Sequence, residues 1–480
     1  MSLRFFCVFL LFLPINLFAS EWSGLPPLLP KGTQLSYMVV DPTDNKVIAE
    51  SQKTVLRTPA SIQKLLTATA AKLFLGDKFR YQTVIEGNLE RLKNRQYQGD
   101  LRVHFVGDPT LSRADIRNML KRLKHLGINN ITGNILLNQA HFSGYQWSNG
   151  QAWNDLGVCY TAPANAIIVN RNCVLGNLSL NAKNTHKARL FIPDYEPVTI
   201  SSDVSIVTKK QREEQFCDLE VTRNSRNHYH LWGCMVARKQ PLALAFAVND
   251  PFIYAQQIIK SELTKLGISL SGKIILDNNS ETENTLFTEV LARHQSPLLS
   301  DLLQVMMKES DNLIADSLFK TLGAAYFHSA GNFRNGAQAV KQILKMHGID
   351  LENAYLADGS GLSRHNLMSA ELFMSVLTYI YKNDSQLKLL SSFAVAGVDG
   401  TLKYYKGMRG KLFKGKVRAK TGSMKGVANI LGVLNGQQGD RLFVLILNGY
   451  NFPDTSSGNS KNVNKYLFQQ AFFKTMMGPL

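Results

Sequence analysis

Strand-like segments stand at both ends of this 480-residue chain. Residues 33–51, with turn-forming residues at 42–45, have the pattern of two strands. Residues 417–423, 427–435 and 441–450 have the pattern of three more. Because short connections join antiparallel neighbours, we expect one sheet that takes strands from both ends of the chain. The middle of the chain is then an insertion.

The middle of the chain differs in character from its ends. Residues 86–280 are rich in short β-like runs, whereas a helical pattern begins at about 297, breaks at ESDN (309–312) and then resumes. A chain of this length exceeds one ordinary core. We therefore predict a main domain from residues 21–85 and 281–480, and an inserted region from residues 86–280.

The first 20 residues, MSLRFFCVFLLFLPINLFAS, combine one charge, Arg4, with an apolar stretch that Pro14 interrupts. This pattern is typical of a secretory signal peptide cut near Ala19 or Ser20, and it is too short for a transmembrane helix. We expect no transmembrane anchor in the rest of the chain. A closing helix at about 460–476 contains the apolar run FFKTMM; packing onto the sheet is favoured, and peripheral contact with a membrane stays open.

Export would place the remaining cysteines in an oxidising compartment, where disulfides form. They are Cys159, Cys173, Cys217 and Cys234. Three pairings are possible. We favour Cys159–Cys173 and Cys217–Cys234, because both disulfides close short loops. The alternative is a zinc site at His228, His230 and Cys234. The alternating residues around 227–237 favour an edge strand whose histidines face solvent.

The net charge of +18 is of the kind that signals a polyanionic partner. Export argues against nucleic acid, and no zinc-finger or RNA-binding signature is present. A cell-wall polymer bearing carboxylates, or anionic lipid headgroups, fits the charge better. A generically basic surface is the alternative.

Residues 58–76, TPASIQKLLTATAAKLFLG, predict a largely buried helix. Ser61 and Lys64 lie one turn apart on one face of it. One interpretation is a capping serine followed by a solvated lysine. The other is a serine nucleophile whose proton is taken by the neighbouring amine. The same spacing recurs at 317–320 and 385–388, so spacing alone does not decide.

Two further motifs occur once each. SDN (310–312) separates two helical segments, and KTG (420–422) lies on a strand-like stretch followed by Ser423. Either motif alone is as well explained by a helix cap or a turn. Together with Ser61 and Lys64, in this order, they supply the groups that an acyl-transfer site needs.

The chemistry gives each motif a task. Lys64 can deprotonate Ser61 only when neutral, which burial and the nearby charge of Lys420 would favour. Ser310 would relay a proton to the leaving group. Asn312 would hold Lys64 and the substrate amide.

The strand would bind the rest of the substrate. Lys420 and Thr421 suit a terminal carboxylate. Gly422 would let a substrate strand lie close, in β-addition. The N–H groups of Ser61 and Ser423 would form an oxyanion hole.

SIQK, SDN and KTGS in this order are the three motifs of penicillin-binding proteins and serine β-lactamases. Almost the whole mature chain resembles the penicillin-binding protein 4 group, the DacB-type D-alanyl-D-alanine carboxypeptidases and endopeptidases of the Gram-negative periplasm. The stretches that carry the resemblance are HFVGDPTL (104–111), DIRNML (115–120), WND (153–155), KESDNLIAD (308–316) and ADGSGLSRHN (357–366).

The resemblance implies an α/β (α+β) fold of the transpeptidase type, an antiparallel sheet flanked by helices, with two additional domains in the insertion. It implies that Ser61 is the acyl-enzyme nucleophile, with Lys64 as base. Asp155 matches an aspartate that recognises the free amino end of a diaminopimelate side chain. Lys425 departs from the glutamine expected there, which leaves the fine specificity open.

We therefore expect a periplasmic serine DD-carboxypeptidase and DD-endopeptidase that trims peptidoglycan stem peptides and cleaves D-alanyl–diaminopimelate cross-links. β-Lactam antibiotics would acylate it, and we expect no metal or cofactor. The alternatives are a serine β-lactamase and a non-catalytic cell-wall-binding scaffold. The long insertion between Lys64 and Ser310 favours the peptidase over the lactamase.

Overall fold

The structure is a computed structural model that describes residues 22, 24–181, 186–279, 287–408, 410–451 and 465–477. The predicted signal peptide and its cleavage site lie outside these residues. No helix among the described residues is long and apolar enough to cross a membrane.

One six-stranded sheet takes strands from both ends of the chain, as predicted, and every neighbouring pair in it is antiparallel. The first and last parts of the chain meet where Gln34 pairs with Asn448 and Val40 with Leu442. In spatial order the strands are β19 (Ala394–Val395), β20 (Val417–Met424), β21 (Val427–Gly436), β22 (Gly439–Asn448), β1 (Gln34–Val40) and β2 (Val47–Ser51).

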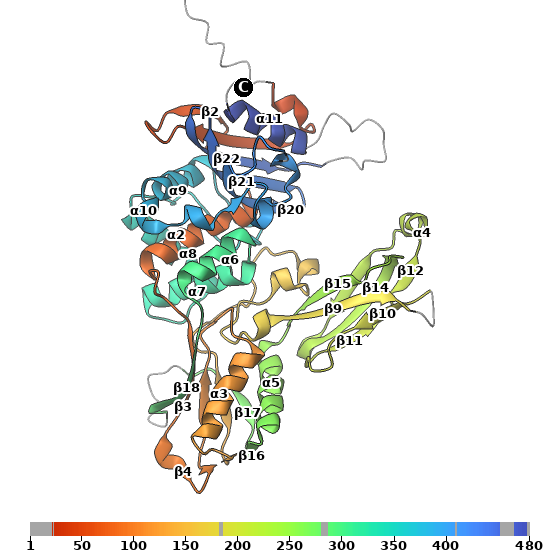
Figure 1. Ribbon diagram of the computed structural model, residues 1–480, viewed down its shortest axis with the longest axis vertical. Helices are drawn as coiled ribbons and strands as arrows, with labels where there is room; N and C mark the ends of the chain where they lie inside the picture. Colours follow the sequence, from red (N-terminus) through yellow and green to blue (C-terminus); the bar gives the residue numbers. More distant parts are fainter. Residues whose placement is uncertain are drawn as a thin grey trace, which may run out of the picture.

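Alternate side chains of this sheet enter two different cores, as the two-residue period of a strand requires. On β22, Leu442, Val444 and Ile446 pack against the larger helical layer, and the residues between them pack against the closing helix α11 (Lys465–Met477). Figure 1 shows α11 on one side of the sheet and the larger layer on the other. That layer contains α2 (Lys64–Phe74), α6 (Leu299–Lys308), α7 (Asn312–Phe327), α8 (Phe333–Met346) and α9 (Ala370–Lys382), which the short α10 (Asp384–Leu387) follows.

The first part of the insertion is a five-stranded sheet with two helices, α3 (Arg113–His125) and α5 (Pro251–Leu266), packed against it. The β-like pattern did not predict these helices. The missed signal for α3 is its capping box, in which Ser112 and Asp115 bond each other's backbone N–H. The strands are β17 (Ile274–Asp277), β8 (Ile135–Asn138), β6 (Leu101–His104), β3 (Gln82–Gly87) and β18 (Glu289–Gln295); a small sheet adds β16 (Ser269–Leu270), β7 (Asn130–Ile131), β5 (Gln96–Tyr97) and β4 (Leu92–Lys93).

The second part of the insertion consists of two small sheets that share one core and extend away from the other parts (Figure 1). The edge-strand prediction for 227–237 is wrong, because β14 (His228–Val236) has strands paired along both of its edges. The other elements are β9 (Cys173–Leu180), β10 (Ala188–Phe191), β15 (Leu242–Ala247), β11 (Thr199–Ser202), β12 (Ser205–Val207), α4 (Lys209–Glu214) and β13 (Leu219–Arg223).

The domain boundaries predicted at 85 and 281 fall differently on the structure. Residue 85 lies inside β3, and residue 281 lies outside the described residues. β3 pairs with β18 and β6, so both β3 and β18 belong by pairing to the inserted sheet. We propose that the main domain contains the residues before 82 and after 295.

Both local disulfides are present, as favoured from the sequence. Cys159 is joined to Cys173 and Cys217 to Cys234. The pairing removes the Cys234 thiolate from the alternative zinc site. His230 instead lies 2.9 Å from the Ser201 hydroxyl through its Nδ1 atom.

The closing helix provides a test of this packing. Phe472 is fully buried against the sheet, and Leu467 on the same helix is exposed. We expect Phe472→Ala to lower the free energy of unfolding of the main domain by about 3–5 kcal/mol, because it leaves a cavity. Leu467→Ala should change it by about 0.5 kcal/mol or less. Urea unfolding compares the two variants, and equal effects would contradict the packing.

Candidate active site

Ser61 lies on a short 3-10 turn, Ala60–Gln63, that leads directly into α2. The prediction of one continuous helix is therefore wrong over its first turn. The capping interpretation is also wrong, because neither the turn nor α2 has a side-chain cap. Ala60 adopts a left-handed conformation with φ of 49°, and strain of this kind is found where the surrounding structure fixes a functional group.

Lys64 is fully buried and is bonded to three different segments of the chain. Its Nζ atom lies 3.0 Å from Ser61 Oγ and 2.6 Å from Asn312 Oδ1. A third contact, of 2.6 Å, joins it to the carbonyl oxygen of Ser360. Serine and lysine thus face the same way, as the sequence predicted.

Burial is the main cause that lowers the pKa of Lys64. The carboxylates of Asp316, Asp358 and Asp311 oppose this shift. The charge of Lys420 was expected to lower the pKa of Lys64. The structure shows instead an effect of Lys64 on Lys420: burial and then the charge of Lys64 lower the pKa of Lys420 well below its usual range.

A loop at 357–366 supplies the Ser360 carbonyl, and two buried carboxylates hold that loop. Asp316 on α7 accepts hydrogen bonds from the backbone N–H groups of Gly359 and Ser360, at 3.0 and 2.9 Å. Asp358 accepts from the N–H groups of Gly361 and Ser363, each at 2.7 Å. The motif analysis assigned neither residue this role: the partners of Asp316 are more than 40 residues away, and those of Asp358 lie within its own loop.

Lys420 and Ser310 form a second hydrogen-bonded pair. Lys420 is fully buried, and its Nζ atom donates to Ser310 Oγ at 2.7 Å and to the Thr421 carbonyl at 2.9 Å. Ser310 has a φ of 61°, again in the left-handed region. The Thr421 hydroxyl lies 3.0 Å from that of Thr401.

The two other residues of the SDN motif have structural partners. Asp311 caps α7, accepting from the Ile314 N–H at 2.9 Å, so the helix-cap interpretation is also correct. Asn312 holds Lys64 as predicted. Its amide nitrogen, expected to bind substrate, donates instead to the Tyr160 carbonyl at 2.8 Å.

The structure shows a reason for glycine at position 422 that the sequence did not suggest. A Cβ there would lie 2.8 Å from the Pro59 carbonyl oxygen and 3.0 Å from the Ser61 nitrogen. The glycine therefore lets β20 approach the turn that carries Ser61. On the neighbouring strand, Asn429 donates to the carbonyls of Thr58 and Pro59 at 2.9 and 2.7 Å, which fixes the same turn.

One edge of β20 is open beside Ser61. β19 pairs only with Arg418 and Ala419, and no other described strand covers the edge from Lys420 to Met424. Ser423 on this stretch is exposed. An extended peptide can pair with such an edge through backbone hydrogen bonds.

The motifs line one cleft of about 520 Å³. Asp155 and Tyr160 reach it from the insertion, and Arg364 and Lys425 lie on its wall from the main domain. Burial and then a hydrogen bond with Asp155 raise the pKa of Tyr160. The lining residues are Ser61, Gln151, Ala152, Asn154, Asp155, Tyr160, Thr161, Ser310, Asn312, Gly361, Leu362, Arg364, Ser423, Met424 and Lys425.

The other two serine–lysine pairs do not contribute to this cleft. Lys320, on α7, is buried and donates to the carbonyls of Tyr145 and Ala164 at 2.8 and 2.7 Å. Lys388 ends α10 in a left-handed conformation.

Known D-alanyl-D-alanine carboxypeptidases are similar to this chain in sequence. D-alanyl-D-alanine carboxypeptidase DacB of Haemophilus influenzae is 37% identical over 436 residues, 91% of this chain and 89% of that protein. A D-alanyl-D-alanine carboxypeptidase of Actinomadura is 27% identical and is matched over 82% of this chain and 74% of its own length.

Solved structures confirm the predicted fold class. The crystal structure of penicillin binding protein 4 (dacB) from Haemophilus influenzae has a TM-score of 0.87 and 36% identity, covering 95% of this chain and 99% of that one. The same protein complexed with a β-lactam has a TM-score of 0.83. The model of the D-Ala-D-Ala carboxypeptidase 3 (S13) family matches residues 27–469. This chain therefore belongs to the D-Ala-D-Ala carboxypeptidase 3 (S13) family.

Proposed function

We propose that this serine DD-carboxypeptidase removes the terminal D-alanine of peptidoglycan stem peptides through an acyl-enzyme on Ser61. The observation that supports this most is that one cleft is lined by the serines of two hydrogen-bonded serine–lysine pairs. Lys64 contacts Ser61, and Lys420 contacts Ser310. Neither a scaffold nor a packed core requires two fully buried lysines with serine partners.

Acylation begins with a neutral Lys64. Its two N–H groups donate to Asn312 and Ser360, and its lone pair then faces the Ser61 hydroxyl. Ser61 Oγ attacks the carbonyl carbon of the penultimate D-alanine while its proton moves to Lys64 Nζ. The N–H groups of Ser61 and Ser423 stabilise the oxyanion, a contribution of about 3–4 kcal/mol for such donors.

Collapse of the tetrahedral intermediate breaks the peptide bond and leaves an ester on Ser61. The proton that Lys64 took from Ser61 passes through Ser310 to the departing amine, so Lys64 is neutral again. Water then attacks the ester and loses a proton to Lys64, which returns it to Ser61 Oγ as the stem peptide leaves. Lys420 and Thr421 bind the terminal carboxylate, while the open edge of β20 pairs with the peptide backbone.

We further propose that the enzyme cleaves D-alanyl–diaminopimelate cross-links as an endopeptidase. The cleft presents the Asp155 carboxylate near Tyr160 and the cations Arg364 and Lys425 on its wall. An ammonium of diaminopimelate suits Asp155, and its free carboxylate suits the two cations. The cation at 425 would favour an acidic group in the substrate.

Two cysteine pairs joined as disulfides support an exported, periplasmic location.

β-Lactams would acylate Ser61, as substrates do. A labelled penicillin distinguishes the alternatives: slow turnover supports the peptidase, fast turnover a β-lactamase, and no label a scaffold.

The nucleophile is tested by Ser61→Ala. The variant should lose both penicillin labelling and peptide hydrolysis, and it should fold normally because Ser61 caps no helix. Ser317→Ala is the matched control, since Ser317 begins the same motif on α7 and its hydroxyl has no hydrogen-bond partner in the part of the chain that the structure describes. Penicillin found by mass spectrometry on any serine other than Ser61 would refute the assignment.

The pH dependence tests the base. Because burial lowers the pKa of Lys64 below 10.5, the neutral amine becomes available at a lower pH than for an exposed lysine. The acylation rate should therefore rise with pH and be half-maximal below pH 10.5. Lys64→Arg, which stays protonated, should not be acylated. A half-maximum at or above 10.5 would contradict a buried amine base.

Asp155→Asn tests recognition of the ammonium. A charge-assisted hydrogen bond contributes roughly 1.5–3 kcal/mol, so the variant should lose about ten- to a hundredfold in kcat/KM on peptides with a free diaminopimelate amine. Peptides with that amine acetylated, and penicillin, should react at nearly the wild-type rate. Equal losses on all substrates would make Asp155 a structural residue.

A further inference from the structure

The loop closed by the Cys159–Cys173 disulfide contacts the SDN segment from both of its ends. Next to the first cysteine, the Tyr160 carbonyl accepts a hydrogen bond from Asn312. Two residues before the second cysteine, the guanidinium of Arg171 pairs with the carboxylate of Asp311. Adjacent residues of the SDN motif are therefore each held by one end of the same cross-linked loop.

We propose that residues 159–173 clamp the SDN segment and that Arg171 is a positioning residue for catalysis, acting through Asp311. This inference rests on the proposed function, because it concerns the same site. Arg171 is not among the residues that line the cleft, so its effect must pass through Asp311.

The conformation around Arg171 is a strained one that other contacts hold in place. Asn170, Arg171 and Asn172 have φ values of 51°, 62° and 48°, all in the left-handed region. Such residues persist only where the surroundings determine them. Asn172 is fully buried, and its amide donates to the carbonyls of Pro163 and Ile167 at 3.3 and 3.2 Å.

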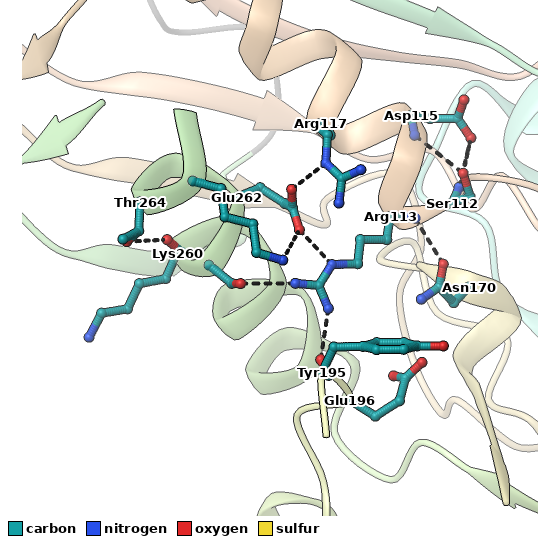
Figure 2. Close-up of polar contacts among 12 residues, drawn as sticks. Ser112, Arg113, Asp115, Arg117, Asn170, Tyr195, Glu196, Lys260, Glu262 and Thr264 are labelled. Carbon is teal, nitrogen blue, oxygen red and sulfur yellow. Dashed lines mark hydrogen bonds and ion pairs between the residues drawn. The ribbon is translucent and has the colours of Figure 1, made fainter. Parts of the chain in front are cut away.

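A cluster of ion pairs around the buried Glu262, on α3 and α5, anchors the other side of this turn (Figure 2). The Asn170 side chain accepts from the backbone N–H of Arg113 at 2.8 Å. The Arg113 guanidinium donates to the fully buried carboxylate of Glu262 at 2.6 Å, and Arg117 donates to the other oxygen at 2.5 Å. Arg171 therefore projects from a braced turn rather than from a free loop.

Asp311 connects this clamp to the chemistry. Its side chain is 7% exposed; one oxygen caps α7 and the other pairs with Arg171. The charged groups that act on Lys64 are Asp311, Asp316 and Asp358, which favour its ammonium form, and Lys420 lies in the same site. Removing the Arg171 charge leaves Asp311 uncompensated, so Lys64 should then hold its proton more strongly.

The principal test is Arg171→Gln, with the rate of Ser61 acylation by penicillin measured across pH. We expect a loss of about three- to tenfold near neutral pH and a shift of the acidic limb to higher pH, since charges in one network couple at this scale. Arg171→Lys should restore most of the rate.

Arg226→Gln is the matched control. Arg226 is exposed, has a φ of 63° in a similar turn, and has no charged partner among the described residues. Among the described residues it forms no hydrogen bond or ion pair with the SDN segment, and it does not line the cleft, so its replacement should leave the acylation rate and the pH profile unchanged.

Asp311→Asn makes the test directional. Asparagine keeps the helix cap but removes the charge, so the acidic limb should move to lower pH, opposite to Arg171→Gln. In the double variant, Arg171→Gln should add little to the effect of Asp311→Asn. A merely structural role would move neither limb, and additive losses or an unchanged rate in Arg171→Gln would overturn the proposal.

The disulfides offer a second matched pair. Replacing Cys159 and Cys173 together by alanine should slow acylation in the same direction as Arg171→Gln, whereas replacing Cys217 and Cys234 should not. Mass spectrometry of the wild-type penicillin adduct distinguishes a failure of the proposed function from a failure of the clamp. Label on another residue would refute the proposed function, and label on Ser61 with an unaffected Arg171→Gln variant would refute the clamp alone.

Discussion

The burial of one lysine amine is the constraint on which the rest of this structure depends. A charged ammonium in a low-dielectric interior is costly, so Lys64 must be surrounded by acceptors and must also titrate easily. Its acceptors come from Ser61, Asn312 and Ser360, which lie in three separate segments of the chain. The fold therefore has to bring these segments together around the start of α2.

Helix α7 carries out most of that assembly. Its first turn contributes Asn312, and Asp316 one turn later holds the loop that presents the Ser360 carbonyl. Farther along, Lys320 donates to the carbonyls of Tyr145 and Ala164 in the insertion. Burial lowers the pKa of Lys320 to about 8, which is tolerable because both hydrogen bonds can be made by the neutral amine. One helix thus connects the catalytic pairs to the inserted region.

The local sequence pattern was sufficient to predict the main sheet and the motifs. It was not sufficient where contacts between distant residues determine the conformation. The alternation in β22 and the order of SIQK, SDN and KTG are visible in the sequence, and both led to the correct fold and family. The left-handed residue before Ser61 and the approach of Gly422 to the Ser61 turn are not visible. This turn is contacted by Gly361, Gly422 and Asn429, which are hundreds of residues away, and no local propensity encodes such contacts.

The main domain and the inserted region contribute different residues to the active site. The serines and lysines proposed for the chemistry all lie in the main domain, and the inserted region reaches the cleft with Asp155 and Tyr160 and the SDN segment with Arg171. Under the proposed function, a change at the cleft surface, such as one at Asp155, would affect only substrates that carry its partner group. Under the proposed clamp, loss of Arg171 would leave the charge of Asp311 uncompensated, and this would affect every substrate that needs a neutral Lys64. The two proposed roles, selectivity and support, are thus separable by mutation, because they reach the active site through different residues.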